Sequence, residues 1–279
     1  MKINFLLLFI LISGCEKIHS IPFEPVLKAS EWCENQPCVE VNGIILNQPT
    51  SSVLVFLLAF LTIYAGYYFL KTHNNYKSRR WWGYSLISSG IGAFLAGISY
   101  QLFAYELKCS GQEYCNWTNW FEVFYNIMTV MAASSLLIGV GYSCFHTKWL
   151  RLVKIVAALK LLIYVLICLI GAFIPNKFLI SYEFLVIFST PVYLLYLIIN
   201  IYQYLNTKSS LFKYLSLTWI SLFGILIIYY IYLFSGLTES LWKREIWFSA
   251  NDILHVLMIL WIIYIWKFLS KHITDMKKY

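Results

Sequence analysis

The sequence predicts an all-α polytopic membrane protein: a seven-transmembrane-helix bundle with its N-terminus outside and its C-terminus in the cytoplasm. Composition is the first observation, since 60% of the residues are hydrophobic and only 12% are charged. A soluble domain usually has about a quarter of its residues charged, so an ordinary soluble fold is excluded. The other two observations are seven long apolar runs and an uneven distribution of lysine and arginine between them.

Each apolar run is long enough to cross a bilayer. A hydrocarbon core about 30 Å thick requires roughly 20 apolar residues in a helix, and an open sheet would leave its edge groups unsatisfied there. The runs are Val53–Leu70, Trp81–Tyr105, Trp120–Phe145, Ile155–Ile174, Phe184–Tyr202, Leu215–Ser235 and Trp247–Trp266. Together they predict a transmembrane domain over residues 53–270, followed by a cytoplasmic tail over 271–279.

Residues 1–14 have the features of a signal peptide. Lys2 precedes the apolar stretch Phe5–Ile12, which is too short to span a membrane, and small residues follow. The sequence Ile-Ser-Gly-Cys15 also resembles the bacterial lipobox, in which the cysteine is lipidated. An ordinary secretory signal with an incidental cysteine is the alternative. We favour lipidation of Cys15, which predicts a lipoprotein-type second anchor and a bacterial inner (plasma) membrane protein.

Orientation follows from the excess of Lys and Arg in cytoplasmic loops. With the N-terminus outside, thirteen basic residues fall on the cytoplasmic side and six on the exterior side. The cytoplasmic ones are Lys71, Lys77, Arg79, Arg80, Lys148, Arg151, Lys154, Lys208, Lys213, Lys267, Lys271, Lys277 and Lys278. This distribution suits anionic lipid headgroups, and it offers no single basic face for nucleic acid.

The exterior N-terminal segment, residues 15–52, is expected to form a partly ordered cap over the bundle. Exterior compartments permit disulfides, and Cys33, Cys38, Cys109 and Cys115 all lie on that side. Two local pairs, Cys33 with Cys38 and Cys109 with Cys115, are the simplest of three connectivities. A metal knuckle is the rival interpretation of each short pair.

Ionisable groups at membrane depth are the best indicator of function, because hydrocarbon makes them costly. Lys160 is expected to reach the cytoplasmic interface and to have no such role. The remaining polar residues are predicted to gather at the outer ends of the second, third, fifth and seventh spans. They are Ser99, Glu106, Glu122, Asn126, Glu183, Asn251, Asp252 and His255.

Asp252 and His255 are three residues apart on one helix, so they can lie on one face. A carboxylate beside a histidine would fix its tautomer and suits proton transfer or metal binding. An interhelical hydrogen-bond lock is the alternative to a catalytic site made of Asp252, His255, Glu122 and Ser99. If a metal is bound, the ligands would come from His255, Asp252, Glu122 and Glu106.

The polar residues at the outer ends of the seven spans resemble, in outline, the superfamily of alkaline ceramidases and adiponectin-receptor-like hydrolases. The resemblance implies a zinc site with one histidine late in the second span and an H-x-x-x-H pair in the seventh. Here those positions hold Phe103, Asn251 and His255, while Ser99 and Glu122 match the serine and the acid. Because a catalytic zinc needs about three protein ligands, zinc is not expected and no cofactor is predicted.

Three functions remain open for this membrane protein. The first is a non-catalytic, receptor-like or scaffolding seven-helix protein with a polar exterior-side cavity, which binds membrane lipids or a membrane protein partner. The second is a lipid amide or ester hydrolase that uses Asp252 and His255. The third is a structural subunit of a membrane complex. No nucleic-acid partner is expected.

Overall fold

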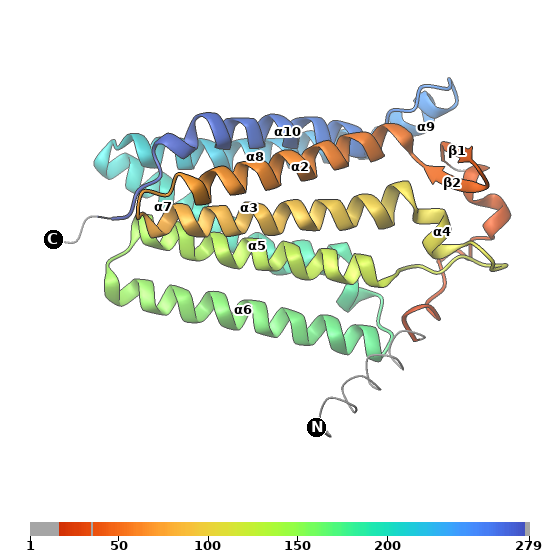
Figure 1. Ribbon diagram of the computed structural model, residues 1–279, viewed down its shortest axis with the longest axis horizontal. Coiled ribbons are helices and arrows are strands. Elements are labelled where there is room, and N and C mark those ends of the chain that lie inside the picture. The colour runs from red at the N-terminus through yellow and green to blue at the C-terminus, as the bar shows by residue number, and fades with distance from the viewer. Residues whose placement is uncertain (1–16, 35, 277–279) are drawn as a thin grey trace.

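The computed structural model describes residues 17–34 and 36–276. In that part of the chain, seven helices are long and apolar enough to cross a membrane, and they lie side by side along one direction (Figure 1). The prediction of an all-α, seven-helix membrane bundle is confirmed. The helices are α2 (Pro49–Lys71), α3 (Lys77–Ala96) with its π-helical extension η2 (Gly97–Leu102), α5 (Trp120–Cys144), α6 (Thr147–Phe173), α7 (Tyr182–Thr207), α8 (Ser210–Phe234) and α10 (Ala250–Lys267).

Shorter elements connect these helices or cover their ends. At the end that also holds strands β1 (Cys38–Val41) and β2 (Ile44–Asn47) lie η1 (Ala29–Glu34), α4 (Ala104–Lys108), η3 (Phe178–Ile180) and α9 (Leu237–Trp242). The remaining 3₁₀ turn, η4 (Leu269–Lys271), follows α10. We call the end with β1 and β2 the hairpin end and the opposite end, where the chain terminates, the basic end.

Two helix boundaries differ from the predicted ones in a way that matters. The run Trp81–Tyr105 is not one α-helix, because the backbone turns π-helical at Gly97–Leu102 before α4 begins. Helix α6 begins at Thr147, whereas the apolar run was predicted to begin at Ile155. The prediction was too late because the first turns of α6 carry exposed cations that lower the local hydropathy. Lys160 therefore lies at the middle of α6, where its Nζ donates to the carbonyl of Phe188, so the expectation that it reaches the cytoplasmic interface was wrong.

Six of the seven helices form a closed ring. Helix α2 packs on α10 and α3, α3 packs on α5, α5 on α7, α7 on α8, and α8 returns to α10. Helix α6 packs on α5 and contributes little to the ring, so Figure 1 shows it at one edge of the bundle. An interior enclosed by six helices at membrane depth is the main consequence of this order.

The walls of the ring differ in tightness. A Cβ added to Gly66 would lie 2.8 Å from the carbonyl oxygen of Gly83, and one added to Gly90 would lie 2.8 Å from that of Ala59. Glycine thus lets the backbones of α2 and α3 touch, as small residues commonly do between membrane helices. On α8, by contrast, a Cβ added to Gly224 would meet no atom within 4 Å.

The segment before α2 is an ordered cap on the hairpin end. Strands β1 and β2 pair antiparallel, and Asn42 and Gly43 make the turn between them with positive φ angles of 53° and 81°. An Asn followed by a Gly, both with positive φ, is the favoured two-residue hairpin turn. Both predicted local disulfides, Cys33–Cys38 and Cys109–Cys115, are formed.

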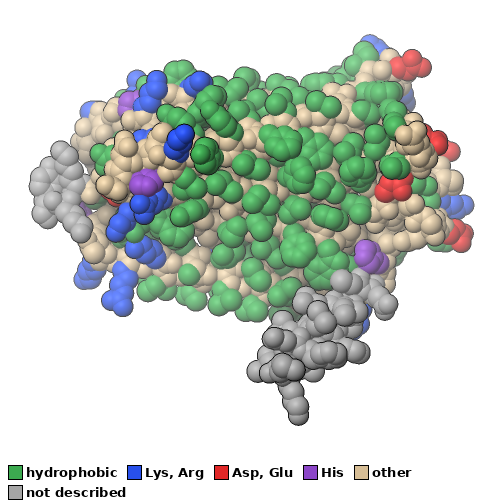
Figure 2. All heavy atoms as spheres, viewed as in Figure 1, with side chains coloured by type: hydrophobic (Ala, Val, Ile, Leu, Met, Phe, Trp, Pro, Cys, Tyr) green, Lys and Arg blue, Asp and Glu red, His purple; other side chains and the backbone are tan. Residues whose placement is uncertain are grey.

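The outer surface of the bundle matches a lipid environment. On the face seen in Figure 2, apolar side chains cover the middle of the molecule, lysine and arginine gather at the basic end, and acidic residues with a few basic ones lie at the hairpin end. A continuous apolar belt between polar ends is the expected surface of a membrane protein. The predicted signal peptide (residues 1–14), the lipidated Cys15 and the last two lysines, Lys277 and Lys278, lie outside the described residues.

Candidate functional site

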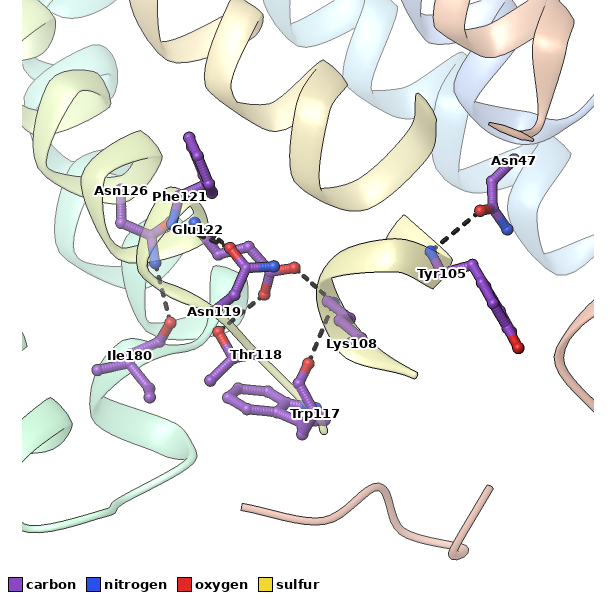
Figure 3. Close-up of polar contacts among 10 residues, drawn as sticks. All are labelled: Asn47, Tyr105, Lys108, Trp117, Thr118, Asn119, Phe121, Glu122, Asn126 and Ile180. Carbon is purple, nitrogen blue, oxygen red and sulfur yellow. Dashed lines mark hydrogen bonds and ion pairs between the residues drawn. The ribbon is translucent and has the colours of Figure 1, made fainter. Parts of the chain in front are cut away.

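The predicted polar cluster divides into two separate hydrogen-bonded groups at the hairpin end. The first centres on an ion pair between Lys108 of α4 and Glu122 of α5, whose side chains are only 5% and 4% exposed. Glu122 also accepts a hydrogen bond from Thr118 Oγ1 at 2.8 Å, and Lys108 Nζ donates to the carbonyl of Trp117 at 3.1 Å. Figure 3 shows these groups converging between the two helices. We call Lys108, Glu122 and Thr118 the ion-pair lock.

Local sequence fixes Glu122 in this lock. Asn119 is the N-cap of α5, and its side-chain oxygen accepts hydrogen bonds from the backbone N–H groups of Phe121 (2.9 Å) and Glu122 (3.3 Å) (Figure 3). Such capping sets where the helix begins and leaves Glu122 in its first turn, where a negative charge is favourable. One turn later, Asn126 donates to the carbonyl of Ile180 at 2.9 Å and ties α5 to η3.

The second group joins α2 to α10 through Asp252. Its Oδ1 accepts a hydrogen bond from Ser51 Oγ of α2 at 2.9 Å. Its Oδ2 accepts from the backbone N–H of Ser249 at 2.5 Å and from the Ser249 hydroxyl at 2.7 Å, which completes a capping box at the start of α10. Both carboxylate oxygens of Asp252 are therefore engaged in structural hydrogen bonds. We call Ser51, Ser249 and Asp252 the capping lock.

His255 does not join the capping lock. It is buried at 9% exposure, and its Nδ1 has no hydrogen-bond partner within the described chain. Ser99 Oγ is buried and likewise unpartnered in that part of the molecule. Glu106 instead accepts from the backbone N–H of Ile45 at 2.9 Å, which holds β2 against α4. The catalytic roles predicted for Asp252, His255, Glu122 and Ser99 stay predictions.

The remaining predicted residues give no metal-binding geometry. Glu183 is exposed at the start of α7, and Asn251 is half-buried on α10. Across residues 17–34 and 36–276, no group of three or more His, Cys, Asp or Glu side chains could hold a metal ion. The carboxylates that the sequence placed in one cluster are divided between two locks, one on α4 and α5 and the other on α2 and α10.

A cavity of about 510 Å³ lies inside the ring of six helices. Its lining extends from Tyr182, the first residue of α7, to Trp82, about five residues or roughly 7 Å from the start of α3 at the basic end. Ligand pockets typically have volumes of about 300 to 1,000 Å³, so the cavity could hold a slender small molecule. His255 lies one turn nearer the hairpin end than Met258, the first α10 residue in the lining.

Aliphatic, aromatic and hydroxyl-bearing side chains line the cavity, and none of its described lining residues is charged. The hydroxyls are spread along the helices, with Thr62 on α2, Ser85 and Ser89 on α3, Thr129 on α5, and Ser189 and Thr190 on α7. An apolar lining with a few fixed polar groups is the usual character of a small-molecule site. It is unsuited to a charged headgroup, which would be left without a counterion.

An aromatic stack lies at the basic-end limit of the cavity. The ring of Trp82 stacks on Phe69 and on Trp219, each with ring centroids 6.1 Å apart. Trp219 in turn packs against Tyr196 at 4.9 Å. The cavity is therefore bounded by rigid side chains on the side of the predicted cytoplasmic interface.

The cavity lining reaches the molecular surface at residues of α7 and α8. Three residues line it and are also exposed: Tyr182 by 37%, Ile227 by 61% and Tyr230 by 38%. They lie on the hairpin-end halves of the two helices, and Gly224 on the same half of α8 meets no neighbour that a Cβ would contact. We call Tyr182, Ile227 and Tyr230 the lateral opening.

Comparison with known proteins identifies the family. The sequence model described as a family of unknown function, DUF6962, matches residues 50–272. The chain belongs to DUF6962. No curated protein and no solved structure matches it.

The DUF6962 region includes every candidate site residue within the bundle. It begins at the second residue of α2 and ends just after η4, so it contains both locks, the cavity and all seven apolar helices. Strands β1 and β2 and the Cys33–Cys38 disulfide precede it. The DUF6962 unit is thus the membrane bundle itself.

The sequence predicted a polar cavity on the exterior side, whereas the cavity of the structure lies inside the ring of helices and has an uncharged lining. These lining residues were missed because only ionisable groups were taken as indicators of function. The signal was present in the spacing of hydroxyls on helix faces. Trp82, Ser85 and Ser89 are three and four residues apart on α3, and Tyr125 and Thr129 are four apart on α5. Such intervals place side chains on one face of a helix.

Proposed function

We propose that this DUF6962 protein is a non-catalytic, receptor-like membrane protein that binds an uncharged, lipid-like molecule in the cavity of its seven-helix bundle. The observation that carries the proposal is the 510 Å³ cavity, lined without charge and enclosed by six helices at membrane depth. If each water-sized group occupies about 30 Å³, the space accommodates on the order of 17 such groups, comparable to one long acyl chain.

The lateral opening supports access from the bilayer rather than from water. Its residues are exposed on the apolar belt, so a molecule dissolved in the membrane meets the cavity lining by diffusion in the plane. Both polar locks lie at the hairpin end, where they tie neighbouring helices together above the cavity. A ligand that moves through the lateral opening need not break either lock.

The same proposal places the hairpin end outside and the basic end in the cytoplasm. Lys and Arg at the basic end favour this orientation, as do the two disulfides at the hairpin end. A bacterial inner membrane is the compartment that the lipobox-like sequence before Cys15 favours. Membrane-impermeant labelling after mild reduction should reach Cys109 and Cys115 and miss a cysteine introduced at Lys208; the reverse pattern would overturn this orientation.

Photo-crosslinking tests whether the cavity binds a lipid. The purified protein is placed in nanodiscs with a diazirine derivative of stearyl alcohol, irradiated and digested, and the labelled peptides are mapped. We expect label on α3, α7 and α8 residues of the lining, reduced at least five-fold by Ala93→Phe, which fills the cavity.

A matched control separates the cavity from the lipid-facing belt. Ala158 is exposed on α6 and outside the lining, so Ala158→Phe adds the same group without filling the cavity. It should leave cavity labelling unchanged. Labelling confined to belt residues, or equal loss in both variants, would refute the proposed binding function.

A further inference from the structure

The hydrogen bonds of the cavity lining leave two groups unsatisfied. The three threonine hydroxyls of the lining are internally bonded: Thr62, Thr129 and Thr190 each donate to the carbonyl four residues earlier, at 2.6, 2.9 and 2.7 Å. By contrast, Trp82 Nε1 and Ser189 Oγ are buried and lack a hydrogen-bond partner among the described residues. Buried polar groups are usually paired, so each exception asks for an explanation.

Trp82 is the more informative of the two. It is 1% exposed, and its ring is held between Phe69 and Trp219. A Cβ added to Gly139 would lie 3.1 Å from Trp82 Cδ1, so α5 also packs closely against the indole. An indole Nε1–H can only donate a hydrogen bond, and here its position is fixed before any ligand arrives. The missing partner must therefore be an acceptor.

A second tryptophan in the lining shows the contrast. Trp261 Nε1 donates to the carbonyl of Thr218 at 2.9 Å, so its indole needs nothing from the cavity. Trp82 and Trp261 thus line the same cavity with the same side chain, but only the N–H of Trp261 has a hydrogen-bond partner among the described residues. This difference makes Trp261 a matched control for Trp82.

We propose that Trp82 Nε1–H and Ser189 Oγ–H are the recognition groups of the cavity, and that they select an uncharged lipid carrying a carbonyl or hydroxyl oxygen over a plain hydrocarbon chain. This inference rests on the proposed lipid-binding function and names its ligand class. Trp82 lies toward the basic end and Ser189 nearer the hairpin end, so the groups serve two acceptor positions along one elongated ligand.

The lining also excludes the charged alternative. None of its described residues is a cation that could neutralise a carboxylate or a phosphate. Transfer of an unpaired charge into such a site is strongly unfavourable, whereas a neutral carbonyl oxygen satisfies a donor that is already desolvated. A fatty acid anion and a phospholipid headgroup should therefore bind worse than a neutral ester or alcohol of equal chain length.

Competition in nanodiscs tests this selectivity. Methyl stearate, octadecane and stearate each compete with the diazirine derivative of stearyl alcohol, and the concentration that halves cavity labelling is measured. For the unaltered protein we expect methyl stearate to compete about 5- to 30-fold better than octadecane, because one neutral hydrogen bond of roughly 1 kcal/mol gives about five-fold and two give about thirty-fold. Stearate should compete worst.

Substitution at Trp82 then isolates the N–H group. Benzothienylalanine, in which sulfur replaces the indole N–H, keeps the ring shape and should reduce the ester-to-hydrocarbon ratio about five-fold without weakening octadecane. Ser189→Ala should reduce the ratio about two- to three-fold. The same benzothienylalanine replacement at Trp261 should leave the ratio unchanged, because that N–H is already bonded to the carbonyl of Thr218 and does not serve a ligand.

The outcomes separate this inference from the function beneath it. Cavity labelling that methyl stearate and octadecane reduce equally would overturn the recognition groups and leave lipid binding intact. Retained selectivity in the Trp82 variant would do the same. Absence of cavity labelling in the unaltered protein would overturn both. Equal weakening of every competitor would mean that Trp82 only maintains the fold.

Discussion

Replacing Lys108 with methionine should strongly destabilise the protein. The change removes the ammonium but keeps most of the apolar side chain, so packing around α4 is preserved. Glu122, 4% exposed, would then keep its hydrogen bonds to the neutral hydroxyls of Thr118 and Tyr100 but would have lost its cation. Removing one partner of a buried ion pair typically costs about 3 to 5 kcal/mol, because the other charge is left buried and uncompensated. We expect a loss of that size in the free energy of unfolding.

Two further variants show whether the loss comes from the pairing itself. Lys108→Met combined with Glu122→Gln removes both charges and should return the unfolding free energy to within about 1 kcal/mol of the unaltered protein. Lys177 forms an ion pair with Glu24 in which the two side chains are 29% and 77% exposed. Lys177→Met should therefore cost no more than about 1 kcal/mol.

Denaturant or thermal unfolding in one detergent measures all three variants. For domains of roughly 150 to 250 residues, 1 kcal/mol corresponds to about 2 to 4 °C in Tm. The reasoning would be refuted if Lys108→Met cost no more than Lys177→Met, or if adding Glu122→Gln gave no recovery. Either result would mean that the ion-pair lock is not an energetic unit.

Three other predictions follow from the described contacts. Asp252→Ala breaks the capping box and removes the carboxylate acceptor of Ser51, so thermal unfolding should show a loss of about 2 to 4 kcal/mol; a loss below 0.5 kcal/mol would contradict the capping lock. Ile227→Trp narrows the lateral opening and should slow labelling of the cavity at least three-fold, whereas Ile228→Trp, on the exposed face outside the lining, should not; equal rates would argue against this opening. Burial first, and then the neighbouring Lys271, lower the pKa of His272, so its folded state favours the neutral ring and loses stability as pH falls below about 6.5. An NMR titration midpoint at or above that value would contradict the burial of His272.

The membrane architecture could be predicted from the sequence because it depends on properties averaged over whole segments and does not depend on individual contacts. Length, hydropathy and the separation of basic from acidic residues are sufficient to define spans and polar ends. The predicted start of α6 was wrong for a local reason. The first turns carry exposed cations, which do not prevent helix formation because their long side chains can extend to the interface. Lys160 consequently lies at the middle of α6, where its Nζ donates to the carbonyl of Phe188 on α7 at 2.9 Å.

The candidate site was less predictable because it depends on which helices are neighbours. Asp252 and Glu122 both lie at the hairpin end, as expected, but α10 packs on α2 while α5 packs on α3. No sequence pattern available to us fixed that order, so the two carboxylates were placed in one cluster. The β1–β2 hairpin, by contrast, could have been predicted locally, because Asn42–Gly43 is a characteristic two-residue hairpin turn.

The hydroxyl-lined cavity illustrates the same limit. Its residues are ordinary serines, threonines and tyrosines, which most often bond to their own helix, as Thr62 and Thr129 do. Only the packing shows that these faces surround a cavity and that Trp82 Nε1 has no hydrogen-bond acceptor among the described residues. The uncharged cavity and the unpartnered indole N–H of Trp82 are thus the features that indicate a binding function.

Native mass spectrometry tests the central claim most directly. The protein is released from nanodiscs of defined composition that contain methyl stearate, and collisional activation is raised until loosely bound lipids are stripped. Our account predicts one uncharged lipid retained per chain, lost in Ala93→Phe and kept in Ala158→Phe. A chain that emerges without bound lipid at the energy that removes the belt lipids, or retention that Ala93→Phe does not alter, would contradict it.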